Sequence, residues 1–519
     1  MNPLRLLQTL RHLRPRQVGY QLYYRTTGRL ATNYAAAPAA AVVPQDAPAL
    51  PPEAAGLPAR QTGPARFTFL NRTVDFGAAG RIDWNYAALG KLWTYNLNYF
   101  EYLRQADTDP AVGQALISAW VAAEATHRDG WEPYPTSLRL VNWGQFYRTH
   151  GLTMPPEVRA SLGRQVYALT RSVEYHLDGN HLLENALALA YAGRAYGLPR
   201  VGRRGDRLLT DQLGRQYLAD GAHYELSPMY QYVLLWRQLD LCSVLGPDDP
   251  LRPALRSSVE QQLGWARALG NAALVYPHFN DSTPGVAPDP AATFAYAGAL
   301  GLSTAAGRLG ASGYRRWSWG ATDAWLDAAA IGPDHIPGHA HADNLTFVLH
   351  HAGRPLVVDP AVSTYEKNAR RHWERSTAAH NTVTPAGGGS TSDVWGGFRV
   401  GERSYTTVER EVAGRELTAV RRGRGSEHRR TWRRDGGSLT IVDEAAGGTA
   451  RLHFAHDQTP LLTAHGLSCG PLNLSWTAAR AVRLTDYEQA TGFNERRPAR
   501  CLEIDFTDRL TTVFTFTDR

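Results

Sequence analysis

The chain has 519 residues, of which 43% are hydrophobic and 20% charged, an ordinary composition for a folded protein that excludes wholesale disorder. Its length exceeds what one hydrophobic core usually organises, so at least two domains are expected. The net charge of +7 favours an acidic partner, and the 14 Trp and 24 Tyr favour a polyanionic glycan, because flat rings stack on sugars. The sequence contains no nucleic-acid-binding motif, so no nucleic-acid partner is expected.

Cysteine usage and the start of the chain bear on cellular location. Cys242, Cys469 and Cys501 form no CxxC pair, so neither a disulfide framework nor a cysteine metal site is indicated. Arg5 and Arg11 interrupt the apolar run that a signal peptide needs. The sequence therefore predicts a cytoplasmic protein, with the periplasm or secretion as the alternative. It predicts no membrane span, since no stretch approaches about 20 apolar residues, and it leaves the oligomeric state open.

The first 83 residues predict an N-terminal segment with three parts. Residues 1–30 have helical spacing, with leucines at 4, 7, 10 and 13 on one stripe. The Ala/Pro-rich stretch at 35–58 is typical of an extended connector. The alternating stretch at 66–77 predicts a small hairpin.

The remainder divides into a helical part and a strand-rich part. From 84 to 330, amphipathic helices follow one another between Gly, Pro and Asp breaks, which predicts a bundle or a closed ring of helical hairpins. From 331 to 519, short alternating strands predict an antiparallel sandwich. We therefore expect an α+β multidomain fold in which a helical domain precedes an all-β domain.

The first motif with candidate catalytic residues is NHLLEN at 180–185. Asn180, His181 and Glu184 are spaced to share one helical face, where the Glu184 carboxylate would fix the tautomer of His181 and raise its pKa. Asn180 would supply a neutral donor. The alternative interpretation is a polar helix start that Asn180 merely caps.

The second motif is HYELSPMYQY at 223–232. Ser227 is a natural cap and Pro228 suits a first helical position, which puts Tyr230 in the first turn with its hydroxyl free to face a cleft. Tyr224 is the competing hydroxyl. The alternative for either tyrosine is simple packing in the core.

The third motif is GHAHADN at 338–344, ahead of an apolar strand. In extended chain His339 and His341 point to the same face. Asp359 ends the next strand, and His380 lies further on in RSTAAHN. Two histidines and a carboxylate suit a zinc-like divalent ion, whereas an isolated pair would be two surface histidines.

Five motifs in chain order carry a family resemblance: NHLLEN, HYELSPMY, HAHADNLTFVL, PLVVDP and RSTAAHNTV. They resemble the heparinase II/III-like polysaccharide lyases, and the stretches at 92–103 and 131–143 are also similar to the helical domain of that superfamily. The resemblance implies an N-terminal (α/α) toroid of helical hairpins, the catalytic domain at 84–330, followed by a C-terminal antiparallel β-sandwich at 331–519.

The resemblance also implies site roles. Asn180 would neutralise the substrate carboxylate, and Tyr230 and His339 would act as acid and base. His181 and Glu184 would support the carboxylate site. One structural divalent metal, zinc or alternatively manganese, would be held by His341, Asp359 and His380, with no organic cofactor.

Two further stretches offer substrate contacts. In the aromatic-rich stretch at 131–143, Trp131, Tyr134 and Trp143 are candidates for sugar stacking and Arg139 for a carboxylate or sulfate. His278 and Asp281 are candidates from a second cleft loop. Core packing is the alternative for the aromatics.

The predicted function is cleavage of uronic-acid-containing glycans by β-elimination, leaving 4,5-unsaturated uronate ends. Glycosaminoglycans (hyaluronan, chondroitin sulfate, heparan sulfate) are the preferred substrates, and alginate or a bacterial exopolysaccharide is the alternative. A metal-dependent hydrolase is the leading rival enzyme, in which His339, His341, Asp359 and His380 would all bind an ion that activates water. A non-catalytic glycan-binding protein is the rival from another class.

Overall fold

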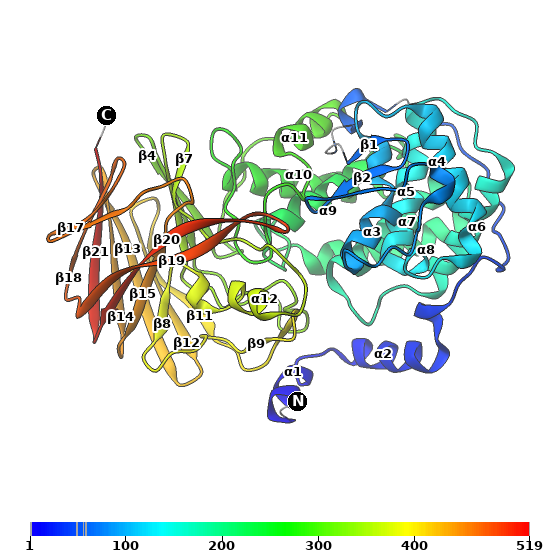
Figure 1. Ribbon diagram of the computed structural model, residues 1–519. Coiled ribbons are helices and arrows are strands. Elements are labelled where there is room, and N and C mark those ends of the chain that lie inside the picture. Colours follow the sequence, from blue (N-terminus) through cyan, green and yellow to red (C-terminus); the bar gives the residue numbers. More distant parts are fainter. Residues whose placement is uncertain (1–2, 48–49, 56, 58–59, 518–519) are drawn as a thin grey trace.

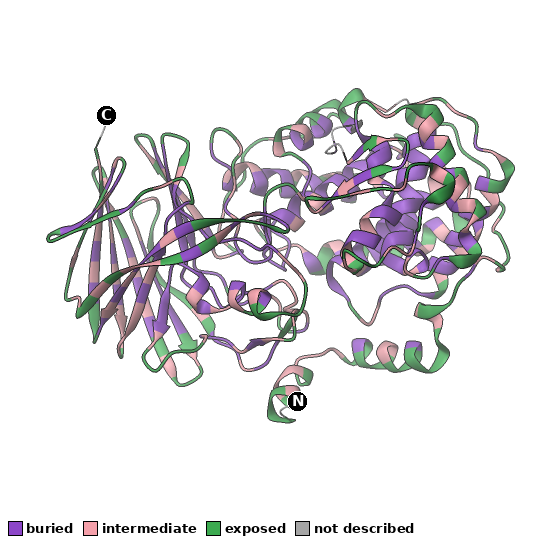
Figure 2. Cartoon of the chain, in the orientation of Figure 1, coloured by how far each residue is buried: buried purple, intermediate pink, exposed green. Residues whose placement is uncertain are grey.

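The computed structural model describes residues 3–47, 50–55, 57 and 60–517, and it places a helical domain beside a β-domain (Figure 1). The predicted order, helices first and antiparallel strands second, is confirmed. Buried residues fill the interior of both domains (Figure 2). None of the helices in the described ranges has the length and apolar character to cross a membrane.

The N-terminal segment contains two helices instead of one. Helix α1 spans Pro3–Leu10 and α2 spans Pro15–Thr27, because Pro15 cannot continue the first helix and starts the second. A three-stranded sheet follows, β1 (Gln61–Gly63), β2 (Arg66–Phe69) and β3 (Arg72–Asp75). The predicted hairpin is its β2–β3 pair, turning at Leu70 and Asn71.

Most helices of the helical domain begin at or next to a proline, which suits the first helical turn. They are α3 (Lys91–Tyr99), α4 (Pro110–Ala122), α5 (Pro133–Thr149), α6 (Pro156–Arg171), α7 (Gly179–Ala195), α8 (Pro199–Gln216), α9 (Pro228–Cys242), α10 (Arg252–Leu269) and α11 (Pro290–Ala299). Short 3₁₀ turns at Glu101–Arg104, Glu124–Thr126 and Asp129–Trp131 connect several of them.

The helices form two layers. Helices α3, α5, α7, α9 and α11 pack in sequence against one another, and α4, α6, α8 and α10 lie outside them. The sequence explains the division, because α5 is buried continuously from Pro133 to Tyr147 whereas α8 buries only one face. The site described below lies at the ends of the inner helices.

The β-domain contains an eight-stranded antiparallel sheet, a pair of four-stranded antiparallel sheets and a short hairpin. The large sheet has the order β11-β12-β13-β14-β21-β18-β17-β16, and the smaller sheets are β19-β20-β15-β8 and β4-β5-β6-β7. The strands are β4 (Tyr314–Trp319), β5 (Thr322–Asp327), β6 (Phe347–His351), β7 (Arg354–Val357), β8 (Val383–Pro385), β9 (Val394–Trp395), β10 (Arg399–Val400), β11 (Tyr405–Val412), β12 (Glu416–Gly423), β13 (Ser426–Asp435), β14 (Ser438–Ala445), β15 (Gly448–His453), β16 (Leu461–Thr463), β17 (Gly466–Cys469), β18 (Leu472–Thr477), β19 (Ala481–Gly492), β20 (Glu495–Phe506) and β21 (Arg509–Phe516).

Alternating side chains of these sheets form the sandwich core. On β14, every second residue from Leu439 to Asp443 is buried. Phe347 of β6 and Phe514 of β21 meet edge to face across the core, 5.7 Å apart between ring centroids. The short helix α12 (Ala369–Glu374) lies on the side that faces the helical domain (Figure 1).

Two of the contacts between the domains lie outside the site described below. The N-terminal helices cross from one domain to the other: Arg5 pairs with Asp393 at 2.8 Å, and the Tyr24 hydroxyl donates to the carbonyl of Val173 at 2.5 Å. The turn of the β19–β20 hairpin meets the β2–β3 turn, where Asn71 Nδ2 donates to the carbonyl of Phe493 at 3.0 Å.

Candidate active site

A pocket of about 610 Å³ lies between the two domains. One wall comes from the inner helices and includes Tyr134, Asn180 and Tyr230. The opposite wall comes from the β-domain and includes His339 and Phe398. Three of the four predicted catalytic side chains, on elements far apart in the sequence, therefore meet around one cavity, and the fourth, His181, lines it as well.

Asn180 sits in the first turn of α7. Asp178 caps the helix by accepting from the backbone of Gly179 at 3.0 Å, so the interpretation of Asn180 as the cap is wrong. Gly179 has φ +58°, and a Cβ there would collide with the Glu225 carboxylate, which explains the glycine. The Asn180 backbone N–H donates to Glu225 Oε1 at 2.7 Å, and its Nδ2 to Oε2 at 3.1 Å.

Glu225 was missed by the sequence analysis, although it lies inside the HYELSP motif. Its side chain is buried and bonds only through long-range contacts. The Glu225 carboxylate accepts from Asn180 Nδ2, so the side-chain oxygen of Asn180 points away from it. Glu225 Oε2 also lies 3.4 Å from His339 Nε2. These hydrogen bonds hold the Asn180 amide in one orientation.

His181 is supported by Glu174, and the predicted support from Glu184 is wrong. His181 Nδ1 lies 3.0 Å from Glu174 Oε1, and its ring is 4.4 Å from that of Tyr134. Burial alone would lower the pKa of His181, but the Glu174 carboxylate raises it above its ordinary value. Glu184 is buried 3.8 Å from Arg237, and burial raises its pKa well above the usual range.

Tyr230 and His339 face each other across the domain boundary. Their ring centroids are 4.1 Å apart, and the Tyr230 hydroxyl is 3.4 Å from that of Tyr365. Burial raises the pKa of Tyr230, so its hydroxyl is protonated at rest. The Ser227 hydroxyl accepts from the backbone of Tyr230 at 3.3 Å, which confirms the predicted cap. Tyr224 is buried outside this pocket.

Asp281 positions His339 and is not a substrate contact. It is fully buried, and its Oδ2 lies 2.9 Å from His339 Nδ1. Arg371 donates to the same carboxylate at 2.7 Å through Nη2. Burial would raise the pKa of Asp281, but Arg371 and the two histidine hydrogen bonds hold it well below the ordinary value. With Nδ1 donating to this anion, His339 directs the lone pair of Nε2 toward Asn180, 3.3 Å away.

Of the predicted substrate contacts in the 131–143 stretch, one lines the pocket and three do not. Tyr134 lines the pocket as expected. Trp131, Arg139 and Trp143 are buried inside the helical domain, so their predicted role in stacking or anion binding is wrong. Arg139 donates to the carbonyls of Asn98 and Gly130 and lies 4.0 Å over the Trp120 ring.

The second predicted cleft loop also lies outside the pocket. His278 is half-buried, bonds the Ser282 hydroxyl at 2.9 Å and does not line the cavity. Burial lowers its pKa to about 4, so it is neutral at physiological pH. The loop contributes instead through Asp281, behind His339.

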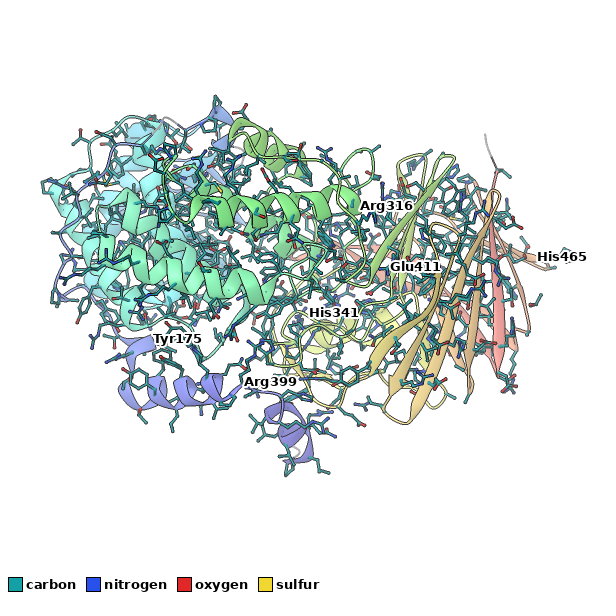
Figure 3. The ribbon with its side chains drawn as sticks, turned by 180° about the vertical axis from the view of Figure 1, so that it is seen from behind. Tyr175, Arg316, His341, Arg399, Glu411 and His465 are labelled. Atoms are coloured by element: carbon teal, nitrogen blue, oxygen red, sulfur yellow. The ribbon has the colours of Figure 1, made fainter. Side chains whose placement is uncertain are left out.

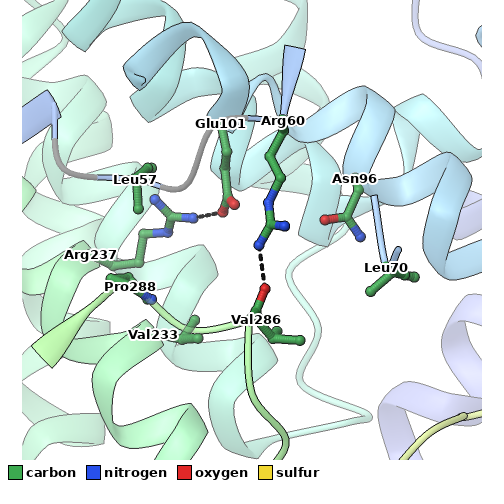
Figure 4. A pocket seen from close by; sticks show the side chains of 10 residues that line it. Leu57, Arg60, Leu70, Asn96, Glu101, Val233, Arg237, Val286 and Pro288 are labelled. Carbon is green, nitrogen blue, oxygen red and sulfur yellow. Dashed lines mark hydrogen bonds and ion pairs between the residues drawn. The ribbon is translucent and has the colours of Figure 1, made fainter. Parts of the chain in front are cut away.

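A smaller cavity adjoins the pocket (Figure 4). Arg237 lines both cavities, and its guanidinium pairs with Glu101. Arg60, on the other side, donates to the backbone carbonyl of Gly285. The cleft therefore continues past the catalytic residues toward two cations.

The predicted metal ligands are neighbours on the β side of the boundary, where Figure 3 labels His341. His380 Nδ1 is 2.7 Å from Asp359 Oδ2, and the rings of His341 and His380 are 5.3 Å apart. His341 Nδ1 and His380 Nε2 are buried and unpaired, a donor chemistry that fits a divalent ion. Across the residues that the structure describes, no three His, Cys, Asp or Glu side chains are grouped closely enough to hold an ion, so the metal stays a prediction.

Comparison with known families identifies the class. Residues 89–294 match the heparinase II/III N-terminus, and residues 302–513 match the heparinase II/III-like C-terminal domain. These two matches account for most of the chain. The chain belongs to the heparinase II/III-like family.

Particular relatives are more distant. Heparin-sulfate lyase from Bacteroides stercoris is 26% identical over 242 residues, covering 40% of this chain and 36% of the relative. Heparin-sulfate lyase from Pedobacter heparinus is 27% identical over 258 residues, covering 41% and 37%. The matched region thus spans little more than a third of the length of these curated relatives.

The fold is shared over almost the whole chain. The crystal structure of heparinase III superposes with a TM-score of 0.65 at 16% identity, covering 98% of this chain and 93% of that one. A mutant of heparan sulfate lyase HepC from Pedobacter heparinus superposes with a TM-score of 0.59 at 18% identity, covering 97% and 88%. The expected toroid followed by an antiparallel sandwich is confirmed.

Proposed function

We propose that the protein is a polysaccharide lyase that cleaves uronic-acid-containing glycosaminoglycans by β-elimination. The observation that carries the proposal is the convergence of Asn180, Tyr230 and His339 on one pocket between the domains. An amide donor, a protonated phenol and an oriented imidazole are the groups that this reaction needs. The names of the curated relatives support the same activity.

Asn180 and His181 would bind the substrate carboxylate and so make the C5 proton easier to remove. That proton is hard to remove because the adjoining carboxylate is already anionic. A protonated His181 would donate to the carboxylate, and the Asn180 amide would join it by turning the N–H that faces His339 toward the substrate. Both donors would stabilise the dianion that develops, as in an oxyanion hole. The raised pKa of His181 beside Glu174 keeps this donor charged over a wider pH range.

The acid and base are supplied by Tyr230 and His339. Asp281 holds His339 in the tautomer with its lone pair on Nε2, and this lone pair serves as the base once the Asn180 amide, 3.3 Å away, turns to the substrate. Tyr230 carries its proton at rest and donates to the leaving glycosidic oxygen on C4. When the C5 proton lies on the other face of the ring, Tyr230 would first pass its proton to His339 Nε2. The phenolate would then take the C5 proton and the imidazolium would protonate the leaving oxygen, which would allow both glucuronate and iduronate.

The proposal includes one structural divalent metal, zinc or manganese, held by His341, Asp359 and His380. When bound, it would brace the β-domain wall beside the pocket through its ligands. His339 remains a base, because its Nδ1 is already committed to Asp281 and its Nε2 faces Asn180. All steps of the elimination are assigned to side chains of the chain itself.

The test is an assay for the double bond. Purified protein is incubated with heparan sulfate, chondroitin sulfate, hyaluronan, alginate and a capsular uronan, and ultraviolet absorbance of unsaturated uronate is followed. We expect absorbance to rise with at least one glycosaminoglycan and to stay flat with His339→Ala. New reducing ends without absorbance would establish a hydrolase instead, and tight binding without either product would establish a glycan-binding protein.

A further inference from the structure

A second concave surface lies away from the catalytic pocket, between α2 and the helical domain. It is a groove of about 410 Å³ where α2 passes the C-terminal end of α6 and the start of the loop to α7. Figure 3 labels Tyr175 from that loop beside α2. We call this surface the α2 groove, and it is lined by Arg16, Gly19, Tyr20, Tyr23, Tyr24, Arg29, Thr170, Arg171, Tyr175 and Arg204.

The α2 groove has a strong positive charge. Four arginines line it, Arg16, Arg29, Arg171 and Arg204, and none of its described lining residues is acidic. Ion pairs are frequent elsewhere in the protein, yet over the described ranges none joins these four guanidiniums to a carboxylate. Arg204 donates to the backbone carbonyl of Thr170, at 2.7 Å. Uncompensated guanidiniums around one groove favour an anionic ligand.

Tyrosine rings form the rest of the surface. Tyr24 is buried and bonds the Val173 carbonyl, so it makes the floor. Tyr20 and Tyr175 are partly exposed, with ring centroids 4.5 Å apart, and Tyr23 is 36% exposed. The Arg16 guanidinium lies 3.9 Å over the Tyr175 ring, so cation and ring are presented together. Exposed rings interleaved with guanidiniums suit a sulfated or carboxylated sugar chain.

We propose that the α2 groove is a second binding site for acidic polysaccharide, which holds the polymer on the enzyme while another stretch occupies the catalytic pocket. The polymer's identity rests on the proposed function. The two sites are distinct, because they share no lining residue. They are also adjacent, since the loop before α7 presents Tyr175 to the groove and Glu174 to His181 of the pocket.

The geometry predicts different behaviour for polymer and for short oligosaccharide. A ligand that spans both sites gains from a raised effective concentration at the second site, whereas a tetrasaccharide occupies the pocket alone. The attraction is between exposed charges, so it weakens as salt is added. A loss at the groove therefore raises KM for polymer and leaves kcat unchanged.

The experiment compares two double variants. Arg16→Ala with Arg171→Ala removes two groove cations, and Arg203→Ala with Arg207→Ala removes two exposed arginines of α8 outside the groove. Binding of polymeric heparan sulfate and chondroitin sulfate is measured by calorimetry in a Tyr230→Phe background at two salt concentrations. We expect about tenfold weaker binding for the groove variant, which corresponds to about 1.4 kcal/mol, and little change for the control.

Several outcomes decide the matter. Equal polymer binding by the groove variant and the control variant overturns the proposal. So does a groove variant with Tyr230 intact that loses turnover of tetrasaccharide as much as turnover of polymer. Retention on phosphatidylglycerol vesicles that the groove variant loses, with glycan binding unchanged, would make the groove a lipid-headgroup site and overturns it too. If no glycan is cleaved but the groove variant still loses glycan binding, the proposed lyase function is wrong and the α2 groove is still a binding site for acidic polysaccharide.

Arg16 also packs on Tyr175, so its removal could loosen α2. Tyr23→Ser serves as the second variant, because it removes a partly exposed ring without changing charge. We expect it to weaken polymer binding severalfold with an unchanged unfolding temperature. Full polymer affinity in Tyr23→Ser, together with a lowered unfolding temperature in the arginine variant, would overturn the proposal.

Discussion

The two walls of the catalytic pocket are built by different rules. On the helical wall, Asn180 and Tyr230 stand in the first turns of α7 and α9, each behind a capping side chain. On the β wall, His339 lies in a segment without helix or strand. It is held by side chains from distant parts of the chain, Asp281 at its ring and Arg375, which donates to the Ala340 carbonyl at 2.8 Å. Local rules place one half of the site, and long-range contacts place the other.

The two domains also contain comparable buried ion pairs. In the helical domain Arg104 donates to both oxygens of Asp240, at 2.5 and 2.7 Å. In the β-domain Arg430 does the same to Asp443, at 2.6 and 3.0 Å. All four side chains are buried. In each domain, a bidentate arginine is thus the main partner of a carboxylate that water does not reach.

The largest effect is expected at the hydroxyl of the helical wall. Tyr230→Phe removes one oxygen from the pocket, so glycan binding and folding should persist while turnover falls by about two or more orders of magnitude. Tyr224→Phe is the matched control, since Tyr224 is buried outside the pocket. The measurement is the initial rate of ultraviolet absorbance. An inactive Tyr224→Phe beside an active Tyr230→Phe would assign the hydroxyl to the wrong tyrosine.

The buried pairs test whether the domains unfold independently. Arg104→Met and Arg430→Met each remove the bidentate guanidinium from a buried carboxylate and leave only weaker partners, among them Arg237 at 3.8 Å from Asp240 and His428 at 2.7 Å from Asp443. Each should cost up to about 3–5 kcal/mol of unfolding free energy. Differential scanning calorimetry should show an earlier transition of the helical domain for the first variant and of the β-domain for the second. A single transition lowered equally by both would mean that the domains unfold as one unit.

The metal prediction separates two histidines of the β wall. If His341, Asp359 and His380 hold an ion, His341→Ala should lose it and lower the unfolding temperature, because metal affinity is coupled to folding. His339→Ala should abolish elimination and keep both the ion and most of the stability. The measurements are elemental analysis and thermal unfolding on the two variants. Loss of the ion from both would make His339 a ligand and favour the hydrolase.

The smallest effect concerns pH on the helical wall. Because the folded-state pKa of His181 is raised, its charged form and the stability it contributes are complete below the ordinary value near 6.5 and are lost as pH rises through the raised pKa. We expect kcat/KM to fall over the same window. Glu174→Gln should move this fall in kcat/KM to lower pH, because it removes the carboxylate that raises the pKa of His181. An unchanged profile would show that His181 does not act as a charged donor.

The sequence was sufficient for the parts that follow local rules. The Ser227–Pro228 helix start placed Tyr230 correctly, and strand alternation predicted the antiparallel domain. It failed where tertiary packing decides. Helical spacing paired His181 with Glu184, but the partner is Glu174 from the preceding loop, and Glu184 faces Arg237.

Two other failures have similar causes. The sequence predicts Asp281 as a cleft residue because its bond to His339 spans 58 positions, which no local pattern reveals. It predicts a sugar platform in the aromatic stretch that includes Trp143, whereas α5 belongs to the inner layer and is buried on every side. Burial on all faces removes the amphipathic pattern that would have revealed the packing.

The contact between the β2–β3 and β19–β20 turns forms an arch beside the pocket, since Leu70 and Phe493 both line it. The arch is closed by two amide hydrogen bonds, from Asn71 to the Phe493 carbonyl and from Asn494 to that of Leu70. Each is worth only about 0.5–1.5 kcal/mol. If the protein cleaves a polymer as proposed, internal cleavage would require the polymer to pass this arch sideways, whereas a chain end would enter beneath it. We therefore expect a variant that lacks both bonds to shift its products toward internal cleavage.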